Sequence, residues 1–380
     1  MSDTHAHTSA DLPTDPVEEV VPYMPVVLPV VGGIMMFASA SLGLLARVDG
    51  SPLKLAFTQL MLGLIPGIIL MIGFRYAPPK WLERIPPLAY AGSLILTLAV
   101  FIPGIGATIN GATRWIDLGF TTVQPAEFLK IGVILMLAWW LSKAKGRLSD
   151  MRSGLIPFGL IIGIPFIILL AQPNTSTVIV IGVTAVAMYV LAGAPWRDFL
   201  ILFLGAAVLA AGLVATRPYL MARVMTFVHP SENGHTSGYQ IQQSLIAIGS
   251  GGFVGRGFGQ SAQKFNYLPE AQGDSVFAVY GEEFGFIGTL IMVFLFVAFA
   301  ARGFSIAADA STMYAALAAT GLTLLITISA FLNIGAMLAI LPLTGLPLPF
   351  VSHGGTALLV DLAMVGFILN VAAHRKRQKK

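Results

Sequence analysis

The chain of 380 residues contains no cysteine and few charged residues. Without cysteine it has no disulfide and no thiolate site, so loops outside a membrane must be held by packing and hydrogen bonds. Charged residues make up only 11% of the chain and hydrophobic residues 56%, which lies far outside the range of soluble globular domains. The composition therefore predicts a polytopic membrane protein.

Long apolar stretches determine the expected fold. A bilayer core about 30 Å thick needs roughly 20 apolar residues per helical span, and ten stretches qualify. We therefore predict an all-α protein of about ten transmembrane helices. They cover approximately residues 24–46, 53–74, 86–103, 125–142, 154–171, 175–192, 198–216, 276–301, 312–340 and 351–373. The fifth and sixth are separated by only a few polar residues around Gln172, so this tight hairpin is easily mistaken for one bent helix.

Lysine and arginine are distributed unevenly between these stretches. With both termini inside, the cytoplasmic segments hold fourteen of them and the outer segments seven, four of which lie in one long loop. Because short cytoplasmic loops accumulate these residues, we expect both termini in the cytoplasm. The formal charge of +4 then reflects a basic inner face that touches anionic lipid head groups, and it does not indicate nucleic acid as a partner.

The two ends of the chain differ in charge from the membrane domain. Residues 1–23 carry five acidic residues and no lysine or arginine, which is wrong for a secretory signal peptide. We predict a disordered acidic cytoplasmic tail at 1–23, a membrane domain at 24–373 and a basic cytoplasmic tail at 374–380. No internal repeat is found.

Residues 217–275 form one long extracytoplasmic loop between the seventh and eighth predicted helices. Apolar spacing predicts two amphipathic helices in it, around residues 221–228 and 241–248, and the second presents the amide of Gln243 at the membrane surface. A glycine-rich run at 249–264 follows, which is neither a Walker motif nor a dinucleotide fingerprint. It either makes tight turns near the bilayer, or its amides approach an anionic head group together with Arg256 and Lys264.

Several charged residues fall inside the apolar stretches, where an unpaired charge is costly. Glu127 and Lys130 are spaced i, i+3 and predict a buried ion pair, which either fixes helix packing or borders a polar cavity. Asp361 has no charged neighbour at helical spacing and must find a partner on another helix or take up a proton. Of Glu282 and Glu283, at least one must face the protein interior.

Asp274, in the run LPEAQGDS, comes just before an apolar stretch at the outer surface. A carboxylate there could accept a proton from a hydroxyl or ligate a divalent cation. The alternative is a solvated helix cap.

Three segments together resemble the shape, elongation, division and sporulation (SEDS) family, which includes FtsW, RodA and SpoVE. They are GATRWIDLGFTTVQPAEFLK, GYQIQQSLIAIGSGGFVGRGFGQSAQKFNYLPEA and NIGAMLAILPLTGLPLPFVSHGG, and details favour the division-type FtsW branch. The resemblance implies a peptidoglycan glycosyltransferase with ten transmembrane helices in the bacterial cytoplasmic membrane. It implies lipid II and the nascent glycan strand as substrates, and a class B penicillin-binding protein and other divisome or elongasome membrane proteins as partners.

The resemblance also implies roles for individual residues. It places the family's essential aspartate at Asp274, its outer-loop Arg-Trp-Ile element at Arg114 to Ile116, and its charged pair at Glu127 and Lys130. The chain departs from the family at Gly273 and Ser275, where threonine and phenylalanine are usual, and at Gln272, where histidine is usual. Loss of the aromatic neighbour predicts a looser site.

Glycan extension from a lipid-linked disaccharide needs a base beside the attacking hydroxyl, positive charge for the leaving diphosphate and a groove for the lipid tails. We expect Asp274 to be the general base of an inverting transfer. The expected substrate-binding residues are Arg114, Trp115, Arg223, Gln243, Arg256, Ser261, Lys264 and Glu270. A divalent cation, Mg or Mn, could bind Asp274 and Glu270.

Three alternative functions remain open at this point. The first is a lipid II flippase, in which Glu127 and Lys130 line the path. The second is a RodA-type polymerase that acts in elongation. The third is an inactive scaffold that recruits division proteins.

Overall fold

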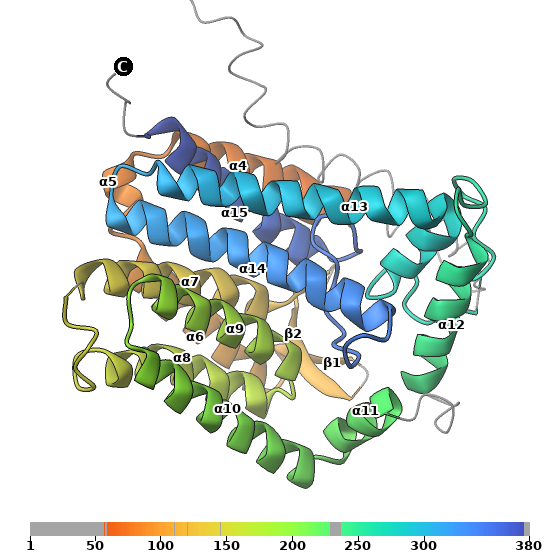
Figure 1. Cartoon of the computed structure of the whole chain (residues 1–380), viewed down its shortest axis with the longest axis horizontal. Helices are drawn as coiled ribbons and strands as arrows, with labels where there is room; N and C mark the ends of the chain where they lie inside the picture. Colours follow the sequence, from red (N-terminus) through yellow and green to blue (C-terminus); the bar gives the residue numbers. More distant parts are fainter. Residues whose placement is uncertain are drawn as a thin grey trace, which may run out of the picture.

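The computed structural model describes Phe57 and residues 59–109, 111–119, 121–144, 146–228, 237–265 and 267–375. The acidic tail, the first expected span at 24–46 and residues 376–380 lie outside the described residues. The described part is a bundle of helices that run roughly side by side, with a small sheet at one end (Figure 1).

The helical elements follow in chain order. They are a π-helical segment (Gln59–Leu64), α4 (Ile65–Tyr76), α5 (Pro79–Leu82), α6 (Pro86–Leu98) with a 3-10 extension (Ala99–Phe101), α7 (Pro125–Lys143), α8 (Leu155–Ala171), α9 (Thr175–Leu191), α10 (Trp196–Thr216), α11 (Pro218–Val228), α12 (Ser237–Ser250), α13 (Val276–Ala308), α14 (Met313–Met337) and α15 (Gly355–Ala373).

These helices confirm the prediction of an all-α polytopic membrane protein. Six helical segments among the described residues are long and apolar enough to cross a membrane, and three shorter apolar ones accompany them. Together they coincide with the nine stretches expected between residues 53 and 373. The fifth and sixth stretches are separate helices, because α8 ends at Ala171 and α9 begins at Thr175.

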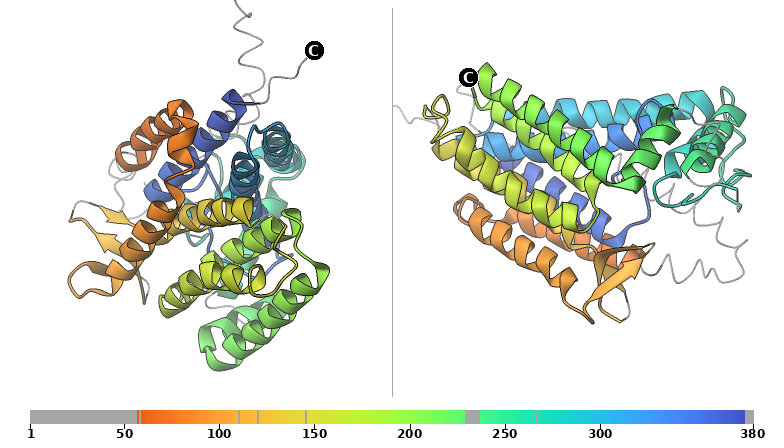
Figure 2. Two further views of the ribbon diagram at one scale, coloured as in Figure 1. Left: turned by 90° about the vertical axis from the view of Figure 1, so that its left-hand side faces the viewer. Right: turned by 90° about the horizontal axis from the view of Figure 1, so that it is seen from below.

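The core of the bundle is formed by α7, α14 and α15. On α7, Leu129, Leu137 and Leu141 are completely buried, and buried residues occur all around the helix, as expected of a central helix. By contrast, α10 lies at the rim of the bundle (Figure 2). Its only buried residue is Asp198, which accepts a hydrogen bond of 2.9 Å from the hydroxyl of Tyr189. Most of the other side chains of α10 are exposed, which suits a helix that faces lipid.

The end of the bundle where α6 ends and α9 begins carries a small sheet (Figure 1). Strands β1 (Gly106–Ile109), β2 (Ala112–Asp117) and β3 (Thr122–Val123) form an antiparallel sheet in the order β1-β2-β3. Helices α11 and α12 lie at the same end (Figure 1) and confirm the two amphipathic helices predicted in the long loop. This arrangement gathers residues from four distant parts of the chain around the start of α13.

Candidate functional site

Asp274 lies in the turn that leads into α13, and the backbone of this turn is held from two sides. The side-chain amide of Asn333 on α14 donates to the carbonyl of Asp274 (2.8 Å) and to that of Leu346 (2.6 Å). The hydroxyl of Ser352 donates to the carbonyl of Gly273 (2.6 Å). The segment between α14 and α15 thus fixes the position of Asp274.

Ser275 ties the same turn to α12. It is buried, its hydroxyl accepts a hydrogen bond of 2.9 Å from the Gln240 amide, and it donates one of 2.9 Å to the carbonyl of Pro269. The departure from the usual aromatic residue at this position led us to expect a looser site. In this structure Ser275 makes hydrogen bonds that a phenylalanine could not make, and the looser site stays a prediction.

Two arginines from separate elements face this turn. Arg114 on β2 donates through Nε to the carbonyl of Gln172 (3.1 Å) and through Nη2 to that of Pro173. Arg223 on α11 donates through Nη1 to the carbonyl of Thr344 (3.3 Å). Both guanidinium groups attract the Asp274 carboxylate electrostatically.

Gly345 lies between Asp274 and Arg223. Its φ is +66°, a conformation that side chains rarely adopt, and a Cβ placed there would lie 3.3 Å from Oδ2 of Asp274 and 3.7 Å from Nη2 of Arg223. Glycine therefore lets the backbone of this segment approach the carboxylate closely.

The surroundings of Asp274 raise its pKa to about 6. The largest cause is burial, followed by the negative charge of Glu270, while Arg223 and Arg114 act in the opposite direction. Burial and the neighbouring Arg223 in turn lower the pKa of Arg114. A carboxyl group with a pKa of about 6 is ionised at neutral pH, yet it accepts a proton more readily than an ordinary aspartate.

Glu270 belongs to the same turn as Asp274. Its φ is +49°, and its carbonyl accepts hydrogen bonds from the N–H groups of Gly273 (2.9 Å) and Ser275 (3.1 Å). Two carboxylates are too few for a closed metal site, and no cluster of three or more His, Cys, Asp or Glu suited to a metal occurs in the described ranges. Two carboxylates do fit a Mg or Mn ion that takes its other ligands from phosphates and water.

Trp115 and Gln243 lie near this end of the bundle without a contact that assigns them a role. Trp115 follows Arg114 on β2 and pairs with Ala107, so its side chain leaves the strand on the opposite face from that of Arg114. Gln243 on α12 is half-buried and lies one helical turn after Gln240. Their predicted part in substrate binding stays a prediction.

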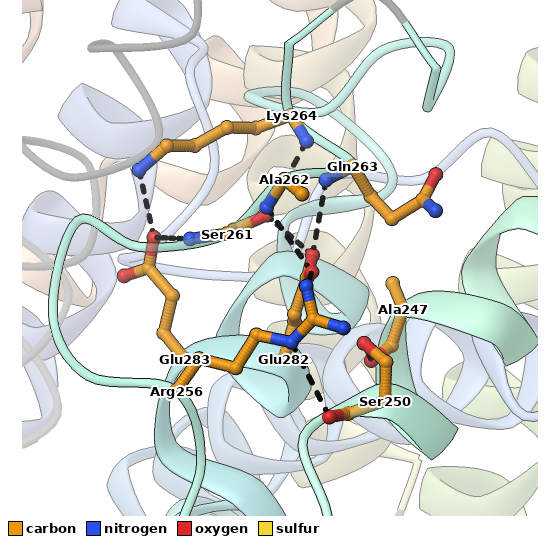
Figure 3. Close-up of polar contacts among 9 residues, drawn as sticks. All are labelled: Ala247, Ser250, Arg256, Ser261, Ala262, Gln263, Lys264, Glu282 and Glu283. Carbon is orange, nitrogen blue, oxygen red and sulfur yellow. Dashed lines mark hydrogen bonds and ion pairs between the residues drawn. The ribbon is translucent and has the colours of Figure 1, made fainter.

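The other predicted substrate contacts lie in a separate cluster (Figure 3). Arg256 pairs with Glu282 at 2.9 Å, and Lys264 pairs with Glu283 at 2.8 Å. The hydroxyl of Ser261 donates to Glu282 (2.6 Å), and the N–H groups of residues 262 and 263 also donate to Glu282, at 3.1 and 3.2 Å. We call these five side chains the loop clamp.

The loop clamp changes the expectation for three residues. We expect Arg256, Ser261 and Lys264 to bind substrate, but in the structure each of them contacts one of the two glutamates, and Lys264 is only 2% exposed. The structure does not bring them to Asp274. Glu282 and Glu283 are both buried, which confirms that at least one faces the protein interior, and their contacts tie α13 to the segment around residues 256–264. Positive φ at Gly252, Gly255, Gly257 and Gly259 supports the tight-turn interpretation of the glycine-rich run.

The intramembrane pair is formed as predicted. Lys130 and Glu127 lie 2.7 Å apart and are both buried. Asp361 on α15 accepts a hydrogen bond of 3.3 Å from the N–H of Phe350, and Lys130 and Glu127 act on it electrostatically. The hydrogen bond to Asp361 thus comes from the segment that holds Asp274.

Sequence reasoning missed four residues that shape the site: Asn333, Thr344, Gly345 and Ser352. All four lie in the segment that carried the third block of family resemblance, so a signal was present, although it marked the segment rather than the side chains. A hollow of about 380 Å³ beside Arg114 was also not foreseen; it is lined by parts of β1, the start of β2 and the Ala171–Pro173 turn.

The chain is similar to several known proteins. The family described as "Cell cycle protein" (FtsW/RodA/SpoVE) matches residues 21–377. The probable peptidoglycan glycosyltransferase FtsW of Alcanivorax borkumensis is 38% identical over 93% of this chain and 92% of its own length. Stage V sporulation protein E of Bacillus subtilis is 40% identical over 74% of this chain and 77% of its own length.

Solved structures agree with this assignment. A chain from a peptidoglycan synthase complex that coordinates polymerization and crosslinking superposes with a TM-score of 0.76 at 25% identity, covering 94% of this chain and 98% of that chain. Rod shape determining protein RodA of Thermus thermophilus gives a TM-score of 0.66 at 26% identity, covering 93% and 98%. The chain therefore belongs to the FtsW/RodA/SpoVE (SEDS) family of multi-pass membrane proteins.

Proposed function

We propose that this protein is a peptidoglycan glycosyltransferase of the FtsW type, which polymerises lipid II on the outer face of the bacterial cytoplasmic membrane during cell division. Asp274 is its general base. The observation that carries the proposal is a carboxylate with a pKa of about 6, flanked by Arg114 and Arg223, at the end of an apolar helix bundle. The names of the relatives support the activity.

The proposed step is a single displacement. Asp274 accepts the proton of a sugar hydroxyl as its oxygen attacks the anomeric carbon, and the bond from that carbon to the polyprenyl diphosphate breaks with its electron pair going to the diphosphate. An α-linked diphosphate becomes a β-linked glycan, so one inversion suffices and no covalent nucleophile is needed. Because two lipid-linked substrates lie in one membrane plane, much of the rate gain comes from positioning.

Arg114 and Arg223 are proposed to receive the diphosphate. Charge-assisted hydrogen bonds from guanidinium groups to phosphate oxygens are strong, and both groups are pre-positioned by backbone carbonyls. Asp274 and Glu270 would hold a Mg or Mn ion if one takes part, and such an ion would add positive charge at the leaving group. Arg256 and Lys264 are not needed for this role, since each already pairs with a glutamate.

The proposal includes an orientation and a partner. The end with Asp274 faces outward, and the end with Lys80, Arg84 and Lys143 faces the cytoplasm, in agreement with the rule that basic residues stay inside. A class B penicillin-binding protein is the proposed crosslinking partner, supported by the similar chain from a complex that couples polymerization to crosslinking.

Purified full-length protein tests the proposal when it is given labelled lipid II in detergent, with and without the penicillin-binding partner. We expect glycan ladders from the wild type and none from Asp274→Ala or Asp274→Asn. Asp117→Asn is the matched control, because Asp117 is an exposed carboxylate at the same end of the bundle, and it should keep the ladders. Undiminished ladders from both Asp274 variants would remove Asp274 from the mechanism, and translocation across vesicles without ladders would favour a flippase.

A further inference from the structure

A second group of side chains converges at the end of the bundle opposite to Asp274. Lys80 and Arg84 lie in and just after α5, Lys143 ends α7, and Thr312 precedes α14. Figure 1 shows α5 at the end of the bundle away from the sheet and α12. These residues line a hollow of about 630 Å³, together with Pro87 on α6 and Met313 on α14. We call it the basic groove.

The charge of the basic groove is positive. Lys80, Arg84 and Lys143 are all exposed, and no carboxylate lies within ion-pair distance of any of them in the part of the chain that the structure describes. The one acidic side chain in the lining, Glu83, accepts a hydrogen bond of 3.1 Å from the hydroxyl of Thr312. The groove therefore offers three cations against one carboxylate, and its net charge is positive.

Two further features add to this positive field. The 25-residue helix α14 begins at Met313, and its N-terminus carries a partial positive charge that points into the groove's lining. The ammonium group of Lys143 lies over the ring of Trp139, 3.6 Å from its centroid. A tryptophan beside a lysine at a helix end is the usual side-chain pair of a membrane interface.

The lining is apolar on the side of the bundle. Pro87 and Met313 contribute to it, and α6 continues from Pro87 with the exposed side chains of Leu88 and Ile95. A ligand with a phosphate head group and acyl chains matches this combination, because the head group meets the cations while the chains follow the helix.

We propose that the basic groove binds the phosphate of an anionic phospholipid of the leaflet at this end of the molecule. Basic pockets between transmembrane helices commonly bind such head groups. A free phosphate ester shares the head-group chemistry but would leave the apolar side uncovered. This inference does not depend on the proposed transferase activity.

Binding is measured on the detergent-solubilised full-length protein, titrated with phosphatidylglycerol, with phosphatidylcholine and with inorganic phosphate. We expect phosphatidylglycerol to bind at least about tenfold more tightly than phosphatidylcholine. The affinity for phosphatidylglycerol should fall as the salt concentration rises. The double variant Arg84→Gln/Lys143→Gln should lose affinity for phosphatidylglycerol by about thirty-fold, since each removed charge near a lipid surface is worth roughly a factor of five to six.

The matched control is Arg147→Gln/Arg152→Gln, which removes two exposed charges from the segment after α7 outside the groove. It should bind phosphatidylglycerol like the wild type. Equal loss in both double variants would overturn the groove as the site. Binding of inorganic phosphate with the same dependence on Arg84 and Lys143, but without preference for phosphatidylglycerol, would overturn the lipid assignment.

Discussion

The environment of Asp274 links its chemistry to pH. Burial and Glu270 raise its pKa to about 6, against the two arginines. A base must be deprotonated to act, so the proposed activity depends on a group that titrates just below neutral pH.

The sequence identified Asp274 and Arg114 through motifs and Arg223 through its place in the long loop. It could not predict the pairs in the loop clamp, because their partners lie 19 to 26 residues away along the chain.

The pH dependence of polymerisation should follow this pKa. We expect kcat/KM to rise with pH through about 6 and to level off above it. Glu270→Gln removes a negative neighbour and should move this limb to lower pH, whereas Arg223→Gln removes a positive one and should move it to higher pH. Initial rates from pH 4.5 to 8 provide the measurement, and a limb that stays fixed in both variants contradicts the assignment.

Asp274→Asn should stabilise the protein at neutral pH. The folded state raises the pKa from 3.8 to about 6, so the ionised carboxylate costs stability above the folded pKa, and this cost disappears below the ordinary value. We expect the melting temperature of the variant in detergent to exceed that of the wild type by about 2 °C or more at pH 7.5. The difference in melting temperature should vanish near pH 4. A variant that is less stable than the wild type at pH 7.5 would show that folding does not raise the pKa of Asp274.

Gly345→Ala should damage the site more than the fold. Its φ of +66° is unfavourable for alanine, and the added Cβ would lie 3.3 Å from the Asp274 carboxylate. We expect a stability loss of about 1 kcal/mol and a fall in polymerisation of about tenfold to a hundredfold. Gly104→Ala is the control, because Gly104 has a φ of +86° but no atom within 4 Å of the added Cβ. This variant should show a similar loss of stability and polymerise at the wild-type rate.

Among the elements, the transmembrane helices were predictable and the sheet was not. Runs of about twenty apolar residues mark helices without regard to packing, so the nine stretches from residue 53 onward agree with the observed helices. Strands β1 to β3 are two to six residues long, too short for an alternating pattern to stand out. The break in α13 at Gly285, where φ is +64°, comes from close contact with the glycine-rich run and is a tertiary effect.

The loop clamp should contribute strongly to the stability of α13. Lys264 and Glu283 are both fully buried as side chains, and removal of one partner from a buried pair costs about 3–5 kcal/mol. We expect Glu283→Gln to lower the melting temperature markedly and Lys264→Met/Glu283→Gln to recover most of the loss. Arg256→Gln is the control, because Arg256 is 44% exposed and the buried Glu282 keeps its hydrogen bonds from Ser261 and from the N–H groups of residues 262 and 263. Its loss of stability should therefore be smaller than that of Glu283→Gln. A double variant no more stable than Glu283→Gln would contradict a specific pairing.

At the scale of the whole molecule, charge and chemistry lie at opposite ends. The proposed active site, the sheet and α12 are at one end, and the basic groove is at the other, with α13 running between them (Figure 1). The composition predicted the membrane protein, and the count of basic residues predicted its orientation. Which loops meet around Asp274 could not be predicted, because that depends on how the helices pack.

The absence of cysteine allows a direct test of the orientation. Thr122→Cys places a thiol on the exposed end of β3, and Ser149→Cys places one on an exposed turn between α7 and α8. In spheroplasts, which have lost the cell wall but keep an intact cytoplasmic membrane, a membrane-impermeant maleimide should label residue 122. Residue 149 should stay unlabelled until the spheroplasts are lysed. The reverse pattern would invert the proposed topology and place Asp274 on the cytoplasmic side.

The unequal lengths of the helices have a consequence for the surrounding bilayer. Beyond Gly285, α13 continues for 23 residues, or about 35 Å, whereas α8 and α9 have 17 residues each, or about 26 Å. The hydrocarbon layer averages about 30 Å. We therefore expect it to thin beside α8 and α9, and beside α13 we expect either a thicker layer or a tilted helix. The bilayer should thus be uneven in thickness around the protein, with lipids of shorter chain favoured beside α8 and α9.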